Sequence, residues 1–330
     1  MVKECNTNSI REAMIAVVPI MAALTMAQSV HGNCLESSAH SVVHEPLTER
    51  LRRHVAVLAG DIGERNVFRP AALRAAADYI RAEWANQGHE VASQWYEVQG
   101  VTTANLAIEL RGKSKPDEIV LIGAHYDSVR GSPGANDNAS GVAALLEISR
   151  DFSRFAPERT VRFVAFVNEE PPFFTSKQMG SMVYAKAARD RGDDVRLMVS
   201  LEMLGFYSDR PGSQSYPPFL RFFYPNRANF VAIVSNLRSR KPLRQLVHAF
   251  RDHSDFPVES LAAFESVPGL GWSDQFSFWR QGYPAVMVTD TAFYRYPYYH
   301  TPFDTPDKVC YAPMTRVVEG LRNAIAAMTR

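Results

Sequence analysis

The chain has 330 residues, of which 46% are hydrophobic and 22% charged, as in an ordinary soluble globular protein. Such a length can bury a full core in one large domain or in two modest ones. Lys and Arg together number 36 and Asp and Glu 35, so the charge balance gives no general attraction to nucleic acid or to an anionic membrane surface.

The N-terminus resembles an export signal. Lys3 and Arg11 supply positive charge, and residues 13–27 are almost wholly apolar but too short to span a bilayer comfortably. Small residues near position 27 offer a cleavage site. We predict a signal peptide over residues 1–27 and export to the periplasm or the medium, with an uncleaved membrane anchor as the alternative.

The three cysteines are too few for a framework of disulfide bonds. Removal of the signal would take Cys5 away and leave Cys34 and Cys310, which form either one disulfide or two unpaired thiols. None of the three has the spacing of a cysteine metal site, so any metal ion would be held by oxygen and nitrogen.

The folded part is expected to follow a flexible segment at residues 28–45. A first helix follows directly, which Thr48 can cap and Gly60 can stop. A second helix is predicted over residues 71–86, with Pro70 at its start.

Strands and helices then alternate along the chain. The run at 119–124 is apolar without alternation, which is typical of a strand covered on both faces. Residues 139–155 carry apolar side chains at steps of three and four and predict a helix. The alternation favours an α/β sandwich with a largely parallel sheet. The other predicted strands are 90–98, 103–110, 161–167, 195–201 and 285–289, and the closing helix is 314–328.

No internal repeat or low-complexity linker divides the sequence, so we predict one catalytic domain over residues 46–330. Residues 205–230 are rich in Pro, Tyr and Phe and lack periodicity, which predicts a long excursion that could cover a functional site. The basic cluster at 238–251 has apolar residues at helical spacing, which indicates a solvated helix face rather than a nucleic-acid surface.

Imidazole and carboxylate groups gather at the ends of the predicted strands. His125 follows the run at 119–124, at the end of the strand where sheets of this kind bind ligands. Asp127 lies two residues on, so in an extended segment its side chain points the same way and can orient the His125 ring. By itself, a His-x-Asp pair is a weak signal of a metal site.

Asp137 lies in a turn rich in Gly and Asn just before the helix predicted at 139–155. It could cap that helix, or its carboxylate could bridge two cations. Glu169 and Glu170 follow the strand at 161–167, where adjacent acids repel unless a cation or water divides their roles. One can bind metal while the other takes a proton from water; a solvated loop pair is the alternative.

Glu202 and His300 complete the set of candidates. Glu202 follows the apolar strand at 195–201, an awkward place for an unpaired carboxylate. His300 follows two tyrosines in a loop near the C-terminus. Alone, each would be an ordinary turn or loop residue. Together with the other acids and His125 they indicate a site for one or two divalent metal ions with a neighbouring general base.

These motifs resemble the zinc-dependent exopeptidase family that includes bacterial leucyl aminopeptidases and aminopeptidase S. The resemblance runs from about residues 62–66 to the C-terminal helix. The motifs that carry it are His125-Tyr-Asp127-Ser, Asn136-Asp137-Asn138-Ala-Ser-Gly, Asn168-Glu169-Glu170, Leu201-Glu202-Met, and Tyr299-His300 with Asp304-Thr-Pro-Asp307.

The resemblance implies a three-layer α/β sandwich around a central mixed, mostly parallel sheet of about eight strands. It also implies two zinc ions bridged by Asp137. His125 and Glu202 would complete one zinc site, and Glu170 and His300 the other.

Glu169 would act as general base and acid, and Asp127 would orient His125. The expected reaction is hydrolysis of the N-terminal bond of peptides with a free N-terminus, in which zinc-activated water loses its proton to Glu169. We expect no nucleic-acid or stable membrane partner. The aromatic loop at 293–303, with Tyr294, Tyr296, Tyr298 and Tyr299, either lines a pocket for an apolar N-terminal side chain or forms a packed cluster.

Two positions depart from the family pattern. Some members have Asp where Glu202 stands, and the extra methylene is compatible with zinc binding. Gln275 stands where a histidine is expected after Asp274, near the substrate cleft.

Three other functions share the fold. A glutaminyl cyclase uses one zinc ion and no attacking water. A carboxypeptidase would need a basic pocket, for which Arg295 is the candidate unless it is an ordinary surface arginine. A non-catalytic binding module would keep the fold, although a complete ligand set with Glu169 argues against it.

Overall fold

A sheet of eight strands forms the middle of the fold. The computed structural model describes residues 45–152 and 155–330, and the predicted signal peptide and nearly all of the predicted flexible segment lie outside the described residues. The spatial order of the strands is β1-β2-β4-β3-β5-β8-β6-β7. The strands are β1 Ala92–Val98, β2 Val101–Leu110, β3 Lys115–His125, β4 Arg159–Phe166, β5 Asp194–Glu202, β6 Val231–Asn236, β7 Val258–Ala263 and β8 Ala285–Thr289.

The strands at the centre of the sheet run parallel. β3 pairs in parallel with β4 and with β5, and β5 pairs in parallel with β8. β2 is antiparallel to β1 and β4, and β6 is antiparallel to β8. The predicted mixed, mostly parallel sheet is therefore confirmed. Because β3, β4, β5 and β8 share one direction, their carboxyl ends meet at one edge of the sheet.

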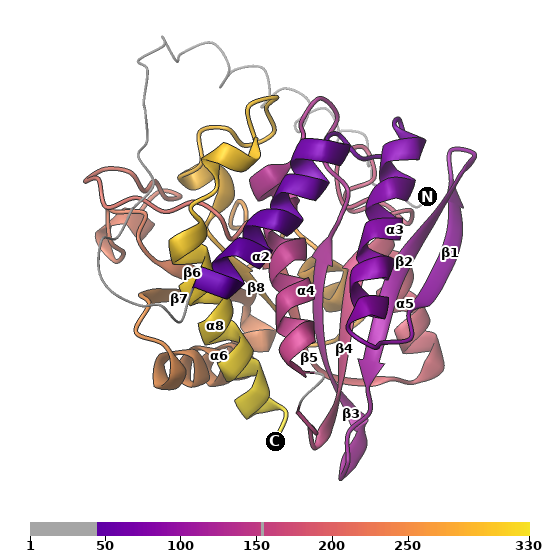
Figure 1. Ribbon diagram of the computed structural model, residues 1–330. Helices are drawn as coiled ribbons and strands as arrows, with labels where there is room; N and C mark the ends of the chain where they lie inside the picture. Colours follow the sequence, from indigo (N-terminus) through magenta and orange to yellow (C-terminus); the bar gives the residue numbers. More distant parts are fainter. Residues whose placement is uncertain (1–44, 153–154) are drawn as a thin grey trace, which may run out of the picture. The chain divides into compact units, whose positions relative to one another are not determined.

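Helices cover both faces of the sheet and complete the predicted three layers. Helices α2, α3, α4, α6 and α8 contribute to one hydrophobic core and α5 and α7 to a second. Successive side chains of β3 point to opposite faces of the sheet. Val120 and Ile122 therefore belong to the first core, and Ile119 and Leu121 belong to the second. Figure 1 shows α2, α3, α4 and α8 together on the near face of the sheet. The helices are α2 Glu45–Val55, α3 Pro70–Asn86, α4 Gly141–Phe152, α5 Gly180–Arg191, α6 Arg240–His253, α7 Gln275–Arg280 and α8 Tyr311–Met328.

The first helix ends differently from the prediction. After α2 the chain continues in a π-helical turn, Ala56–Ile62, and leaves the helical path at Gly63, whose φ of 76° is in the left-handed region. Gly60 lies inside that turn and does not stop the helix. The prediction of a helix from residue 139 is also corrected, because residues 135–140 form a separate turn before α4.

Several other predictions concern the outer parts of the fold. Residues 205–230 form the predicted excursion, in which the helical structure is limited to one 3-10 turn, Leu220–Phe222. Cys310 is disulfide-bonded, and Cys34, with which the sequence allows it to pair, lies outside the described residues. Among the helices of residues 45–152 and 155–330, none has the length and apolar character needed to cross a membrane.

A buried arginine fixes the connection that leads from β3 to α4. The Arg65 side chain is fully buried and donates hydrogen bonds to the carbonyls of Leu58, Gly63, Tyr126, Pro133 and Gly134. Burial lowers its pKa to about 10, so it stays charged at neutral pH. Only a planar group with several fixed donors can serve so many carbonyls at once.

Replacing Arg65 by methionine should therefore lower the free energy of unfolding by about 2 to 4 kcal/mol, because several buried carbonyls lose their donor. Urea unfolding followed by circular dichroism measures this change. Arg69→Met is the matched control, since the Arg69 side chain is 66% exposed and should change stability by less than about 0.5 kcal/mol. Equal effects of the two substitutions would contradict the anchoring role of Arg65.

Candidate metal and catalytic site

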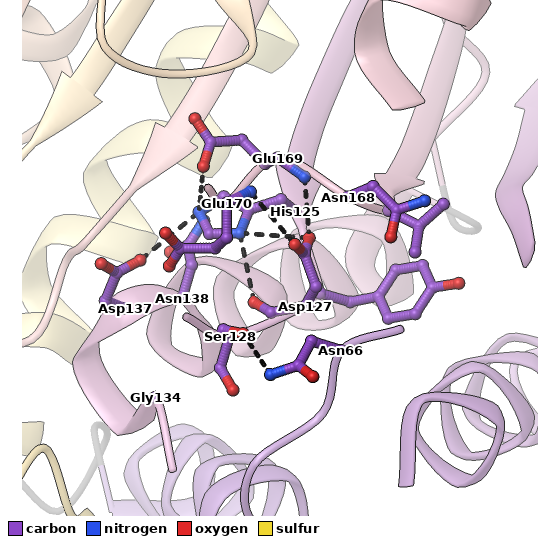
Figure 2. Close-up of polar contacts among 12 residues, drawn as sticks. Asn66, His125, Asp127, Ser128, Gly134, Asp137, Asn138, Asn168, Glu169 and Glu170 are labelled. Atoms are coloured by element: carbon purple, nitrogen blue, oxygen red, sulfur yellow. Dashed lines mark hydrogen bonds and ion pairs between the residues drawn. The ribbon is translucent and has the colours of Figure 1, made fainter. Parts of the chain in front are cut away.

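The carboxyl ends of the parallel strands and the loops beside them bring together the residues that the sequence suggests as metal ligands and general base. β3 ends at His125 and β5 at Glu202, while the turn Ala135–Ser140 lies between β3 and α4. Figure 2 shows Asp137 of that turn and His125 of β3 close to Glu169 and Glu170 of the loop after β4. The converging candidates are His125, Asp137, Glu169, Glu170, Glu202 and His300.

The two oxygens of Asp137 face two different histidines. Oδ1 lies 3.4 Å from Nε2 of His125, and Oδ2 lies 3.1 Å from Nε2 of His300. Glu202 Oε2 lies 3.3 Å from the same nitrogen of His125, and Glu170 Oε2 lies 3.2 Å from that of His300. Asp137 is thus shared by two groups of three residues, each of which could hold a metal ion.

Glu169 lies beside these groups. Its Oε2 is 3.9 Å from His125 Nε2, and it forms a further possible group with His125 and Glu170. The side chain is 6% exposed, so its carboxylate is close to the candidate metal positions and largely shielded from solvent.

Several buried polar atoms of the site have no hydrogen-bond partner among the described residues. They are Nε2 of His125, Oδ1 of Asp137 and Oε1 of Glu170. Buried polar atoms are normally satisfied, so each orphan calls for an explanation. An imidazole nitrogen and carboxylate oxygens aimed at common points are a ligand set that suits zinc. The residues present therefore fit a metal ion.

The electrostatics of the cluster also attract positive charge. Burial and the neighbouring Asp137 raise the pKa of Glu170 to about 7, and burial together with neighbouring carboxylates raises that of Glu169 well above its usual range. Burial alone would lower the pKa of His300, but Glu170 and Asp137 outweigh it and raise the value to about 10. Burial alone would raise the pKa of Asp137, but both imidazoles hold it below its usual range.

Asp127 supports the site in a way that differs from the prediction. The ring of His125 is held through Nδ1, which lies 3.2 Å from the backbone carbonyl oxygen of Asp127, while the Asp127 carboxylate is 3.6 Å away. A carbonyl can only accept, so Nδ1 donates to it and Nε2 faces the site. The Asp127 carboxylate instead accepts the backbone N–H groups of Glu169 and Glu170, each at 3.1 Å (Figure 2).

Two further acids, to which the sequence reasoning gave no role, hold the turn that carries Asp137. Asp304 accepts the backbone N–H groups of Asn136 and Asp137 at 2.8 and 3.0 Å. Asp290 accepts the side-chain amide of Asn136 at 2.8 Å. On the other side of the turn, Asn138 donates to the Leu201 carbonyl at 2.8 Å and so ties the turn to β5. The asparagines on either side of Asp137 were the sequence signal from which a hydrogen-bonded turn could have been predicted.

Ser273 and Gln275 approach the site from the start of α7. Ser273 donates a hydrogen bond to Oε2 of Glu202 at 2.7 Å, a contact that the sequence did not reveal. Gln275, which stands where a histidine was expected, is buried and donates to the Leu270 carbonyl at 3.0 Å. The glutamine therefore supports the wall of the neighbouring cleft.

An apolar cleft begins beside Glu202, and its volume is about 830 Å³ when the open solvent at its mouth is included. The predicted excursion at 205–230 forms one wall, and Phe293, Tyr294 and Tyr299 of the aromatic loop form part of another. Tyr299 also stacks on His300, with ring centroids 3.8 Å apart.

Two tyrosines of the aromatic loop lie outside the cleft lining. Tyr296 is buried and donates to Asp304 at 2.7 Å, and Tyr298 lies against Lys308, whose Nζ is 5.4 Å from the ring centroid. Of the four loop tyrosines, then, only Tyr294 and Tyr299 can contact a ligand in the cleft.

Arg295 is neither a surface arginine nor part of the cleft lining. Its side chain is buried and donates to Gln214 Oε1 at 2.7 Å and to the Phe230 carbonyl at 2.8 Å, which ties two parts of the excursion to the loop after β8. Its guanidinium lies 4.5 Å from the centroid of the Phe230 ring. The proposal that Arg295 binds a substrate carboxylate is therefore wrong.

Comparison with known proteins places these observations in a family. The sequence pattern of Peptidase family M28 matches residues 105–325. The uncharacterized protein YfbL of Escherichia coli (strain K12) is 38% identical over 282 residues, which are 83% of this chain and 86% of that relative.

The fold also occurs in solved structures. BSAP, a zinc aminopeptidase from Bacillus subtilis, matches with a TM-score of 0.69 and 16% identity, over 86% of this chain and 95% of BSAP. The glutaminyl cyclase of Fimbriiglobus ruber matches with a TM-score of 0.60 and 19% identity, over 84% of this chain and 94% of the cyclase. Since identities this low show the fold alone, the sequence matches decide the family: this chain belongs to peptidase family M28, a family of zinc peptidases.

Proposed function

We propose that the protein is an aminopeptidase that removes the N-terminal residue of peptides with the help of two zinc ions. The observation that carries this proposal is the sharing of Asp137, whose two oxygens face two imidazoles in two separate ligand groups. His125, Asp137 and Glu202 would hold one ion. Glu170, His300 and Asp137 would hold the other.

The chain's own groups supply the proton transfers. Bound zinc is a Lewis acid that lowers the pKa of water and polarises a carbonyl group. In the proposed reaction Glu169 accepts the proton of the attacking water at a carboxylate oxygen and later donates it to the nitrogen of the leaving amine. The hydrogen bonds from the Glu169 and Glu170 backbone to Asp127 hold the base in position for both steps.

The charge of the cleft supports recognition of an N-terminus. Its only charged lining residues within the described part of the chain are Glu202 and Glu259, and no Lys, Arg or His lines it. Carboxylates complement the ammonium group of a free N-terminus, whereas a carboxypeptidase needs a cation for the substrate carboxylate. The burial of Arg295 removes the candidate cation.

Two alternatives make different demands on the site. A glutaminyl cyclase needs one metal ion, so a second group of ligands around Asp137 argues against it, although the Fimbriiglobus ruber cyclase shares the fold. A non-catalytic binding module does not need a general base. Glu169 is buried beside the two ligand groups, where a general base would act, and this argues against such a module.

Metal-free protein titrated with zinc should bind two ions per chain, measured by elemental analysis after desalting. Zinc at about 100 times its dissociation constant should also raise the free energy of unfolding by about 2.7 kcal/mol per site. His300→Ala should lose one ion, because one ligand group loses its nitrogen. His248→Ala is the control, since His248 is 79% exposed and remote from the site. A wild-type protein that holds a single ion would favour the cyclase.

Zinc-loaded protein should release leucine from a leucyl peptide and leave the N-acetylated twin of that peptide intact, because acetylation removes the α-amine. A zinc chelator should abolish the release. Chromatography of the products measures both effects. Cleavage of the free and the acetylated peptide at equal rates would show that a free N-terminus is not required. Cleavage of neither peptide would contradict the aminopeptidase function.

Glu169→Gln should lower kcat for peptide hydrolysis by about 10² to 10⁴, because the amide cannot accept the proton of water. Its zinc content should equal that of the wild type, since Glu169 belongs to neither proposed ligand group. Glu170→Gln is the informative partner, as it should lose one zinc ion as well as activity. If Glu169→Gln loses zinc, Glu169 is a ligand rather than the base.

A further inference from the structure

The apolar cleft reaches from the candidate metal site to a carboxylate on the far edge of the sheet. Glu202 of β5 is paired with Thr289 of β8, Thr289 with Ala232 of β6, and Ala232 with Glu259 of β7. All four residues line the same cleft. With neighbouring strands about 4.8 Å apart, the backbone positions of Glu202 and Glu259 are about 14 Å from each other.

The Glu259 carboxylate has no partner of its own. Within the described residues it makes no hydrogen bond and no ion pair, and it is only partly exposed. The cation that acts on its pKa is Arg251, whose guanidinium donates to the backbone carbonyl of Val258 at 3.2 Å rather than to the Glu259 carboxylate. Burial raises the pKa of Glu259 above its usual value. A carboxylate that lines a largely apolar cleft and has no protein partner is available to a cationic ligand.

Aromatic rings flank the carboxylate. Tyr216 and Tyr224 line the cleft and stack on each other, with centroids 5.7 Å apart. Their hydroxyl groups are already used, because Tyr216 donates to the Pro225 carbonyl and Tyr224 to that of Ser260. The two side chains therefore offer a ligand aromatic surface rather than hydrogen bonds. Aromatic surface beside a carboxylate suits a cation.

We propose that this cleft selects peptides whose N-terminal residue is lysine or arginine, with Glu259 as the residue that recognises the side-chain cation. The inference rests on the proposed aminopeptidase function, which puts the α-amine at the Glu202 end of the cleft. The methylene stem of the substrate then packs over Ala232 and Val234, and its charged tip reaches Glu259. A leucine side chain is too short to fill the far part of the cleft.

The test compares lysyl and norleucyl amides, because norleucine keeps the carbon stem of lysine and lacks its ammonium group. Zinc-loaded wild-type protein should have a kcat/KM at least about tenfold higher for the lysyl than for the norleucyl substrate. In Glu259→Gln this ratio should fall to about one or two, since the amide keeps the shape of the side chain without its charge. Arginyl and lysyl substrates should respond alike.

Glu97→Gln is the matched control. Glu97 is an exposed residue of β1, at the opposite edge of the sheet, so the variant makes the same change of charge far from the cleft. It should keep the wild-type ratio. If Glu259→Gln also keeps that ratio, or if the wild type prefers norleucine, the inference is overturned while the aminopeptidase stands.

A binding measurement separates the two proposals if zinc-loaded wild-type protein cleaves neither substrate. That result would contradict the aminopeptidase, and calorimetric titration with lysinamide and norleucinamide would then test Glu259 directly. Lysinamide binding about tenfold weaker in Glu259→Gln than in the wild type supports recognition of the cation. Equal affinities of the two proteins for lysinamide would refute it.

Discussion

Repulsion among buried carboxylates is the constraint on which the rest of this structure depends. Asp137, Glu169, Glu170 and Glu202 are each at most 6% exposed, and they meet at the carboxyl ends of parallel strands. Like charges so close together in a medium of low dielectric constant raise one another's pKa. Added positive charge relieves that repulsion. The chain has therefore built a strong field for cations before any cation binds, which is the electrostatic condition for holding zinc.

The groups that hold this cluster in place are largely acidic as well. Asp127 and Asp304 use their carboxylates to accept backbone N–H groups of the very residues that carry the site. Each such bond fixes the direction of a loop without bringing a competing cation near the ligands. Asn138 adds the tie between the turn and β5. The connection between β3 and α4, the loop after β4, the loop that carries Asp304 and the end of β5 are thereby held to one geometry. The ordering entropy is therefore lost on folding rather than on binding of metal or substrate.

Local sequence patterns predicted most strands of the sheet and the candidate metal ligands, because each of these features depends on a short stretch of neighbouring residues. β8 is a short run of buried residues, α3 has helical periodicity and begins at Pro70, and His125 ends a buried strand. α5 was missed because its buried side consists mainly of small residues, and β7 because most of it is only partly buried. The roles of Arg65 and Ser273 depend on contacts between distant positions, which no local pattern contains.

The position of Glu259 has a consequence for how selectivity can change in this fold. Strands in a sheet have a fixed spacing of about 4.8 Å, so acids placed along one cross-strand row can lie only at set distances from the zinc ligands. An acid at Ala232, one strand nearer to Glu202, would shorten the accessible side chain by one such step. The preferred length of a basic N-terminal side chain can thus change in discrete steps, as the acid moves from one strand to the next. The strands involved carry none of the proposed zinc ligands.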